Sequence, residues 1–577
     1  MLIVFLKKAY IKKTGRTYLS IVQGYRENGK SKNKTIQSLG YLDALEKEYD
    51  NPIHHFENVV VQMNKERLAE ENINLSFNLN DQLERNETNR KNYGHIIASY
   101  IYHELEIDRF LDNARRNENF KYNSEAIMRL LVYTRLLYGG SKLNSYQLKD
   151  TLFDKYDVTD DDIYNCLDHF HEISEKLQHH LHQQIIDKYN RKTDLVYYDV
   201  TNFYFETECQ DELRRRGYSK EGKKKPIVQM GLMMDTMGLP ISYKMFPGNT
   251  HDSQTLMPTL TILKKQFKIG RIITVADKGL NSGDNIAYNS ALKDGYIYSK
   301  GIRGASAEFK EWVTLQDDYL TSPSGFKMKS KVVYDSEIMI TDQVIGKKKK
   351  KKKAYVDQKF IVFYSEKYAK RAKHKREEII AKAQMMIQYP SKYNAILDKG
   401  AAGYVLNMKF DKETGEIKEN LKQELIIDEE RIKEEEQYDG YYALVTSELD
   451  MPDTDVIAKY KGLWKIEESF KITKSTLRTR PIYHKLNDRI NAHFLICFIS
   501  LLIGRIIELR LDSQFTIAKI TDTLNKISCS RIDQNYWLFD HRCDVSDALD
   551  QAFGTNFSDK IMTLKKIKKN FALSKNQ

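Results

Sequence analysis

The chain has 577 residues, 41% of them hydrophobic, which is enough to bury several cores and predicts about three or four domains. Its 92 lysines and arginines exceed its 80 aspartates and glutamates, and the net charge of +12 favours an anionic partner such as nucleic acid. Five separated cysteines without a CxxC pair speak against a disulfide framework and a zinc site. The longest apolar run, residues 494–504, is about half a membrane span, so we expect a buried core helix in a soluble, cytoplasmic protein.

Residues 4–40 have the pattern of a small antiparallel sheet, with two turns that end in Gly15 and Gly29. This stretch is rich in lysine and arginine, and Glu27 is its single acid. It could contact a DNA backbone or form an ordinary solvated face, and the sequence leaves both open. With the helical pattern that follows, it predicts a first domain over residues 1–80.

Residues 93–190 are predicted to be helical, because apolar residues recur at spacings of three and four in HIIASYIYHELEIDRFL and SEAIMRLLVYTRLL. The polar stretch before them, residues 80–92, is predicted to be a linker. A helical domain ahead of a catalytic core could bind DNA. Packing explains the same pattern equally well.

Residues 191–300 predict a mixed sheet. DLVYYDVTNFYFE is rich in β-branched and aromatic residues and predicts a strand with Asp199 in its middle, where a carboxylate needs a partner or a metal. Two closely linked strands follow, IVQMGLMMD and LPISYKMF, then a helix, and then the apolar strand IITVA, which ends at Asp277. This is the order of a ribonuclease H-like α/β fold, in which the first and fourth strands are neighbours. We therefore expect Asp199 and Asp277 to lie together.

Residues 457–483 predict one helix with a basic exit. Tyr460, Glu467 and Lys474 lie two turns apart and form one stripe, which suits a phosphodiester better than a core. Glu468 is rotated by about 100° from this stripe, so Glu467 is the better candidate. The pattern alone is also that of a solvated helix face.

These segments resemble bacterial insertion-sequence transposases of the IS4-related DDE group, and most closely its IS1634-type branch. The matching stretches are LKKAYIKKTGRTYLSIVQGYRENGK, YYDVTNFYFE, GYSKEGKKKPIVQMGLMMDTMGLPISYKMFPGNTHD, VADKGLNS and GLWKIEESFKITKSTLRTRPIYH. The resemblance implies metal-dependent cleavage at the ends of the element. The freed 3′-OH ends are then joined to target DNA.

The same resemblance implies the site residues. Asp199, Asp277 and Glu467 would be the catalytic, metal-binding triad. The implied metal is Mg²⁺, for which Mn²⁺ may substitute, since hard oxygen ligands suit these ions. It implies DNA contacts at Tyr460 and Lys474. The positions of Lys471 beside this stripe and of Arg478 and Arg480 after it predict that they extend the DNA contact. Leu463 stands where the group has an arginine, which leaves that phosphate contact unfilled or passed to Lys461 or Lys465.

The implied partners are double-stranded DNA, as terminal inverted repeats and as target, and a second copy of the chain in a synaptic homodimer. The protein would act in the bacterial cytoplasm, at the nucleoid when bound to DNA. Two other functions stay open: a ribonuclease H-fold nuclease without strand transfer, and a transposase-derived DNA-binding protein without catalysis.

The remaining segments complete the domain prediction. Residues 301–440 are expected to be a mainly β insertion, and the lysine run Lys347 to Lys353 is expected to be a flexible loop or a DNA contact. Residues 441–510 would form the second part of the catalytic core. Residues 511–577 would form a helical extension, with short helices around YWLF.

Overall fold

The computed structural model divides the chain into two compact units, residues 1–87 and 88–577. It describes the whole chain apart from short stretches, the longest of which are residues 70–79, 220–224 and 419–423. The other stretches outside the described residues are 1–3, 13, 28–29, 81, 83–84, 86–87, 117, 268, 324, 346–347, 396–397, 411–414, 534 and 577.

The N-terminal unit is a three-stranded antiparallel sheet with a helix. Its strands are β1 (Val4–Ile11), β2 (Arg16–Glu27) and β3 (Lys30–Tyr41), in the order β1-β2-β3. A short α1 (Leu42–Leu45) leads to α2 (Pro52–Ala69), and Val4, Ile21 and Val60 form a small core between sheet and helix. The predicted sheet is confirmed, while Asn28 and Gly29 of the second turn lie outside the described residues.

The second unit begins with a helical body, as its apolar periodicity predicts. The body is built from α3 (Ile96–Glu104), α4 (Ile107–Arg115), α5 (Ser124–Leu137), α6 (Lys142–Gln147) and α7 (Asp160–Tyr189). Helix α16 (Asn487–Arg510) packs against α5 and α7. It is the one helix in the described part of the chain that is long and apolar enough to cross a membrane, yet 94% of its apolar window is buried in the protein. The predicted core helix is confirmed.

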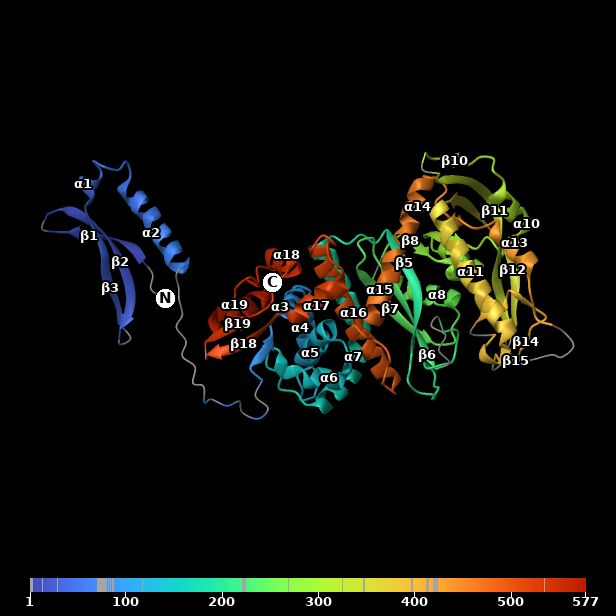
Figure 1. Cartoon of the computed structure of the whole chain (residues 1–577), viewed down its shortest axis with the longest axis horizontal. Helices are drawn as coiled ribbons and strands as arrows, with labels where there is room; N and C mark the ends of the chain where they lie inside the picture. The colour runs from blue at the N-terminus through green and yellow to red at the C-terminus, as the bar shows by residue number, and fades with distance from the viewer. Residues whose placement is uncertain are drawn as a thin grey trace. The chain divides into compact units, whose positions relative to one another are not determined.

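A nine-stranded mixed sheet follows (Figure 1). Its order is β10-β11-β12-β17-β9-β8-β5-β6-β7. The strands that carry the predicted site are β5 (Leu195–Tyr204), β6 (Ile227–Met234), β7 (Pro240–Pro247), β8 (Ile273–Ala276) and β9 (Gly295–Lys300). β5, β6 and β7 form an antiparallel meander, and β8 lies parallel to β5 on its other side. The expected adjacency of the first and fourth strands is therefore confirmed.

The two faces of this sheet pack against different helices. Successive side chains of a strand point to opposite faces. Tyr197 and Phe203 of β5 join the large core that includes α15 (Trp464–Ser475) and α16. Tyr198 and Val200 point the other way, into a second core with α8 (Leu256–Phe267), α9 (Gly283–Ala291) and α10 (Ala307–Thr314).

A buried ion pair ties the helical body to the sheet. Arg191 follows α7 and donates from Nε to Asp235 Oδ2 at 2.7 Å, with both side chains fully buried. A second guanidinium nitrogen donates to Pro240 O at 2.8 Å. These bonds satisfy both charges, which fixes the point where the chain enters β5.

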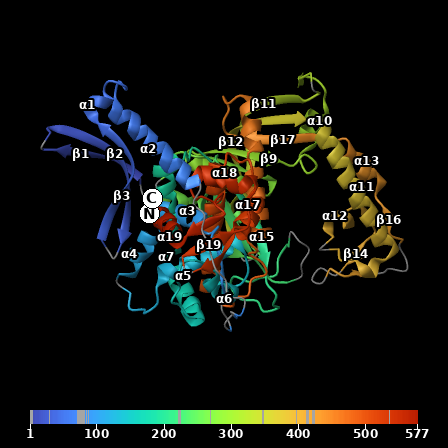
Figure 2. The ribbon, with the colours of Figure 1, turned by 60° about the vertical axis from the view of Figure 1, so that its left-hand side comes forward.

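The 301–440 stretch continues the same sheet and also carries helices. Its two long strands, β11 (Lys327–Ile345) and β12 (Lys348–Tyr364), pair with each other, and β12 pairs with β17 (Tyr441–Thr446). The helices α11 (Glu366–Gln388) and α13 (Glu429–Glu436) lie at this end of the sheet, away from the helical body (Figures 1 and 2).

The lysine run is not a loop. Lys348 to Lys353 belong to β12 and pair with the end of β11, whereas Lys347 lies outside the described residues. Lys352 forms an ion pair with Asp342, and Lys353 with Glu337. Backbone pairing across the hairpin therefore overrides the preference of a charge run for an unpaired loop.

The C-terminal segment contains strands as well as helices. YWLF itself is strand β19 (Tyr536–Phe539), and helices lie before and after it, as predicted. β19 lies in a four-stranded sheet with β20 (Ile561–Thr563), β18 (Ser528–Asp533) and β4 (Arg90–Asn92). The helices of this segment are α17 (Ile517–Lys526), α18 (Asp544–Phe553) and α19 (Leu564–Lys575).

Candidate active site

Asp199 and Asp277 come from neighbouring parallel strands. The register pairs Tyr197 of β5 with Val275 of β8, and each aspartate follows its paired residue by two positions. Because side chains alternate along a strand, Asp199 lies on the face of Tyr197. Neighbouring strands are about 4.8 Å apart, so the register places the two aspartates at matching positions on adjacent parts of the chain. Asp199 is half-buried, and its Oδ1 accepts a 2.7 Å hydrogen bond from the Val200 amide.

Asp277 is held by two hydroxyl groups. Ser299 at the end of β9 donates to Asp277 Oδ1 at 2.7 Å, and Tyr460 donates to the same oxygen at 3.4 Å. The β8–β9 register, which pairs Ala276 with Tyr298, brings Ser299 beside Asp277. Sequence reasoning missed Ser299, since only this register distinguishes it from any other strand serine.

The phenol of Tyr460 is protonated at neutral pH. Burial raises its pKa well above the ordinary range, and the Asp277 carboxylate acts in the same direction. A neutral phenol can donate to a carboxylate but carries no charge of its own. The predicted DNA contact of Tyr460 would therefore compete with its hydrogen bond to Asp277.

The predicted single helix is two helices, α14 (Asp453–Lys461) and α15 (Trp464–Ser475). The chain tightens between them, where Leu463 N bonds Tyr460 O and Lys465 N bonds Gly462 O. A Cβ at Gly462 would lie 1.9 Å from the hydroxyl oxygen of Tyr197, so only glycine allows this close crossing over β5. The break places Tyr460 on a different helix from Glu467 and Lys474.

The two glutamates of α15 have different surroundings. Glu467 is exposed, whereas Glu468 Oε2 forms a 3.1 Å ion pair with Arg505 of α16. Burial raises the pKa of the Tyr442 phenol, and the carboxylates of Asp277 and Glu467 add to this rise. Glu467 and Asp277 thus act on the same tyrosine, while Glu468 is engaged with α16.

Arg505 fixes the position of α15. Its guanidinium donates to Ser469 Oγ at 2.8 Å, to Glu508 at 2.6 Å and to the Lys465 carbonyl at 3.2 Å, in addition to the Glu468 ion pair. A planar guanidinium with several donors suits such a bridge between helices.

The donor set suits a hard divalent cation. Asp199 and Asp277 offer carboxylate oxygens on one face of the sheet, the ligands that Mg²⁺ prefers. Glu467 stands on the helix that covers this face. In the described part of the chain, no three His, Cys, Asp or Glu side chains are gathered closely enough to hold a metal ion.

The predicted DNA contacts follow α15 and its exit. Lys471 is exposed, and Lys474 Nζ lies 5.4 Å from the centre of the Phe203 ring, on the β5 face that carries Asp199. Arg480 lies over the Tyr204 ring, 5.8 Å from its centre. Arg478 is exposed and has a φ of 47°.

The residue at the missing-arginine position cannot bind phosphate. Leu463 is buried in the large core. Of the two proposed substitutes, Lys465 donates to the Thr236 carbonyl, and Lys461 lies over the Phe326 ring at 5.6 Å.

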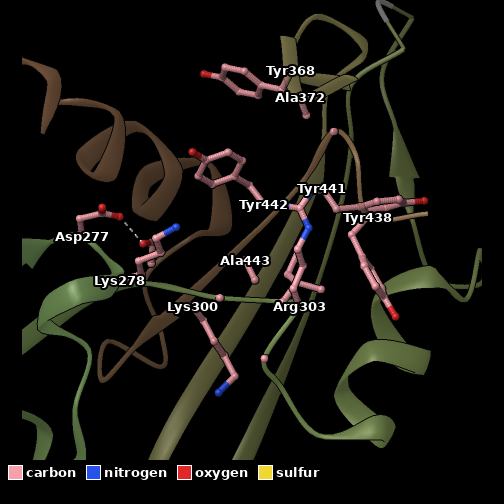
Figure 3. Close-up of a pocket in the computed structure, with 15 residues that line it drawn as sticks. Asp277, Lys278, Lys300, Arg303, Tyr368, Ala372, Tyr438, Tyr441, Tyr442 and Ala443 are labelled. Atoms are coloured by element: carbon pink, nitrogen blue, oxygen red, sulfur yellow. Dashed lines mark hydrogen bonds between the residues drawn. The ribbon is translucent and has the colours of Figure 1, made fainter. Parts of the chain in front are cut away.

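A cavity of about 440 Å³ opens beside Asp277 (Figure 3). Lys278, Arg303 and Tyr442 are among the residues that line it. Arg303 is engaged with Glu435 and Asp439, each at 3.4 Å. The cavity thus extends the candidate site from the ends of β8 and β9 toward α11.

Comparison with known proteins gives matches to two families. Residues 6–72 match the N-terminal domain of IS1634 family transposases, and residues 190–503 match the transposase DDE domain. No curated protein matches the sequence. Among solved structures, the piggyBac transposase synaptic complex with hairpin DNA is 10% identical over 83% of this chain and 82% of that chain, with a TM-score of 0.32. The Mos1 transposase paired-end complex with left transposon end is 10% identical over 41% and 66%, with a TM-score of 0.14.

Proposed function

The chain belongs to the DDE transposase family and is a DNA transposase, and we propose that Asp199, Asp277 and Glu467 are its catalytic residues. The reaction cleaves the ends of an insertion sequence and joins them to target DNA. Water first attacks a phosphodiester at the end of the element and frees a 3′-OH. That hydroxyl then attacks a target phosphodiester, and one bond forms as another breaks in each step.

The observation that carries this assignment is the placement of the two aspartates. They lie at matching positions on neighbouring parallel strands, on one face of the sheet, under the helix that carries Glu467. The strand order β7-β6-β5-β8-β9 supports a ribonuclease H-like core. In such a core the first and fourth strands, here β5 and β8, are neighbours and carry the two aspartates. In this proposal, residues 191–300 and 441–510 form the core, and residues 301–440 interrupt it.

The family implies a divalent metal, and we propose Mg²⁺, with Mn²⁺ as a substitute. Two such ions activate the attacking oxygen and stabilise the leaving oxygen when they are bound. Asp199, Asp277 and Glu467 would hold them. Ser299 and Tyr460 orient the Asp277 carboxylate, and the Arg505 bridge keeps α15 over the sheet.

The basic residues after Glu467 would hold the DNA. Lys471, Lys474, Arg478 and Arg480 follow one another along α15 and its exit, and the exit passes the end of β5, where Ile482 bridges Phe205. Phosphate contacts of this kind position a strand without reading its sequence. We propose that two copies of the chain pair two such ends as a homodimer.

The test uses duplexes that carry the terminal repeats of the element, incubated with the protein and Mg²⁺. Joined products support the proposed function. Nicked ends without joining indicate a nuclease, and binding without cleavage indicates an inactive DNA-binding protein. Light scattering of the DNA complex measures whether two copies assemble on paired ends.

A further inference from the structure

A second cavity, of about 580 Å³, lies between the helical body and the basic exit after α15. Arg135 and Lys142 line it from the helical body, and Arg478 and Arg480 line it from the exit. Two histidines, His484 and His493, also line it. None of the described residues on its wall is an aspartate or a glutamate. The described wall of the cavity therefore carries several basic side chains and no carboxylate of its own.

Lys142 is the most unusual member of this wall, because its side chain is almost fully buried, with 2% exposure. Its Nζ donates to His493 Nδ1 at 3.2 Å, and His493 Nε2 in turn donates to the Thr479 carbonyl at 3.0 Å. These two bonds fix His493 as the neutral tautomer with its proton on Nε2. No carboxylate in the described part of the chain is among the groups that act on the Lys142 charge.

Arg135 does not neutralise the charge of Lys142, because its own side chain is a cation. It is also 2% exposed, and its guanidinium donates to the carbonyls of Leu477 and Arg478 at 3.1 Å each. Burial, and then the nearby Arg135 charge, lower the pKa of Lys142 to about 7. Buried cations are normally paired with acids, so this arrangement stores unfavourable charge that an anion would relieve.

We propose that this cavity binds a phosphate group of the DNA backbone, with Lys142 as its buried ligand. The proposal rests on the proposed function for the identity of the DNA. Arg478 and Arg480 belong to the exit that follows Glu467 and Lys474, so the cavity continues the path of the bound strand. The helical body, whose part in DNA binding the sequence leaves open, would then contribute a direct backbone contact.

The first test needs no DNA and no catalysis. Thermal unfolding is followed for two proteins, the Asp199→Asn variant and the double variant Asp199→Asn with Lys142→Met. Each protein is heated in inorganic phosphate and, for comparison, in chloride at equal ionic strength. Phosphate should raise the melting temperature of the Asp199→Asn protein but not that of the double variant. The matched control is Lys176→Met, an exposed lysine on α7, which should keep the phosphate effect.

The second test locates the phosphate. Each phosphate of a terminal-repeat duplex is replaced in turn by methylphosphonate, which removes its charge. The dissociation constant of each duplex is measured for the protein with Lys142 and for Lys142→Met. At one position of the duplex, methylphosphonate should weaken binding to the protein with Lys142 by about tenfold and leave binding to Lys142→Met unchanged. Lys142→Gln is the second variant, since its amide can still donate to His493 if methionine disturbs folding.

The outcomes separate this inference from the proposed function. Equal phosphate stabilisation with and without Lys142, or equal methylphosphonate effects in both proteins at every position, would overturn the cavity proposal. Loss of the phosphate effect in the variants supports it even if the wild-type protein fails to cleave DNA. Absence of cleavage by the wild type bears only on the catalytic assignment.

Discussion

Ser299 Oγ donates a 2.7 Å hydrogen bond to Asp277 Oδ1, and this bond joins the ends of two neighbouring parallel strands. Ser299 is buried, with 4% exposure, so water does not readily replace its hydroxyl. The bond restricts rotation of the Asp277 carboxylate, which would be a metal ligand in the proposed site. Ser299 is therefore a positioning residue, which acts through Asp277.

Ser299→Ala should lower the rate of DNA cleavage by about tenfold, since a hydrogen bond to a charged group contributes about 1.5–3 kcal/mol. It should also raise the Mg²⁺ concentration needed for half-maximal rate, a change that a merely structural role would not produce. Single-turnover cleavage at several Mg²⁺ concentrations measures both. Ser290→Ala is the control, because that hydroxyl donates to Ile286 of its own helix, and both measurements should match the wild type. An unchanged metal dependence in Ser299→Ala would remove Ser299 from the site.

Glu467→Gln and Glu468→Gln should have opposite effects. Glu467→Gln should abolish cleavage, because it removes a proposed catalytic carboxylate. It should leave thermal stability unchanged, because Glu467 is exposed. Glu468→Gln should keep cleavage but lower the unfolding free energy by about 1 kcal/mol, because it weakens the ion pair with Arg505. Cleavage assays and denaturant unfolding distinguish the two. Full activity of Glu467→Gln would show that another acid completes the triad.

The strand order around the aspartates could be predicted because it rests on local signals. Apolar runs mark β5 and β8, and short connections make β5, β6 and β7 a meander, which leaves Asp199 and Asp277 on adjacent strands. The helix break could not be predicted, since it depends on the contact of Gly462 with Tyr197, far away in sequence. The contact of Ser299 with Asp277 could not be predicted either, since it depends on the register of β8 and β9.

Two other differences have physical causes that a local pattern does not contain. The lysines of β12 lack the alternation that predicts a strand, and pairing with β11 forms one anyway. The sequence predicts helices around YWLF but no strand, and YWLF forms one because Trp537 is buried where β19 lies between β18 and β20. In both cases the partner strand decides the conformation.

Lys474→Ala should weaken binding to terminal-repeat DNA and reduce the salt dependence of binding by about one phosphate contact. Titrations at several salt concentrations give this slope. Lys265→Ala is the control, because Lys265 is exposed on α8, which covers the opposite face of the sheet. If the slope for Lys474→Ala equals that of the control, Lys474 makes no phosphate contact.

The stability of the free protein should depend on pH through Lys142. The pKa of Lys142 is lowered to about 7, whereas an unfolded lysine titrates near about 10.4. Between these values the unfolded chain binds more protons, so the unfolding free energy should rise with pH. Burial lowers the pKa of His484 to about 3 and that of His493 well below its usual range, so both stay neutral there. The other groups that act on Lys142 are Arg135 and the Cys497 thiol, which lies 3.8 Å from His493 Nε2.

Melting temperatures of the wild type and Lys142→Met between pH 7 and pH 10 measure this contribution. The difference between the two proteins should be largest near pH 7, with the variant the more stable, and should shrink as pH rises. A constant difference would mean that Lys142 keeps an ordinary pKa in the fold.

Cleavage of terminal-repeat DNA by Asp199→Asn, with Mg²⁺ and in parallel with the wild type, tests the catalytic assignment most directly. The substitution removes one charged ligand and keeps the size of the side chain, so the protein should fold and bind DNA as before. We predict that the wild type cleaves and joins, and that Asp199→Asn binds the same DNA with unchanged affinity but does not cleave it. Cleavage by Asp199→Asn at the wild-type rate would contradict the placement of the catalytic site at the middle of β5 and the end of β8.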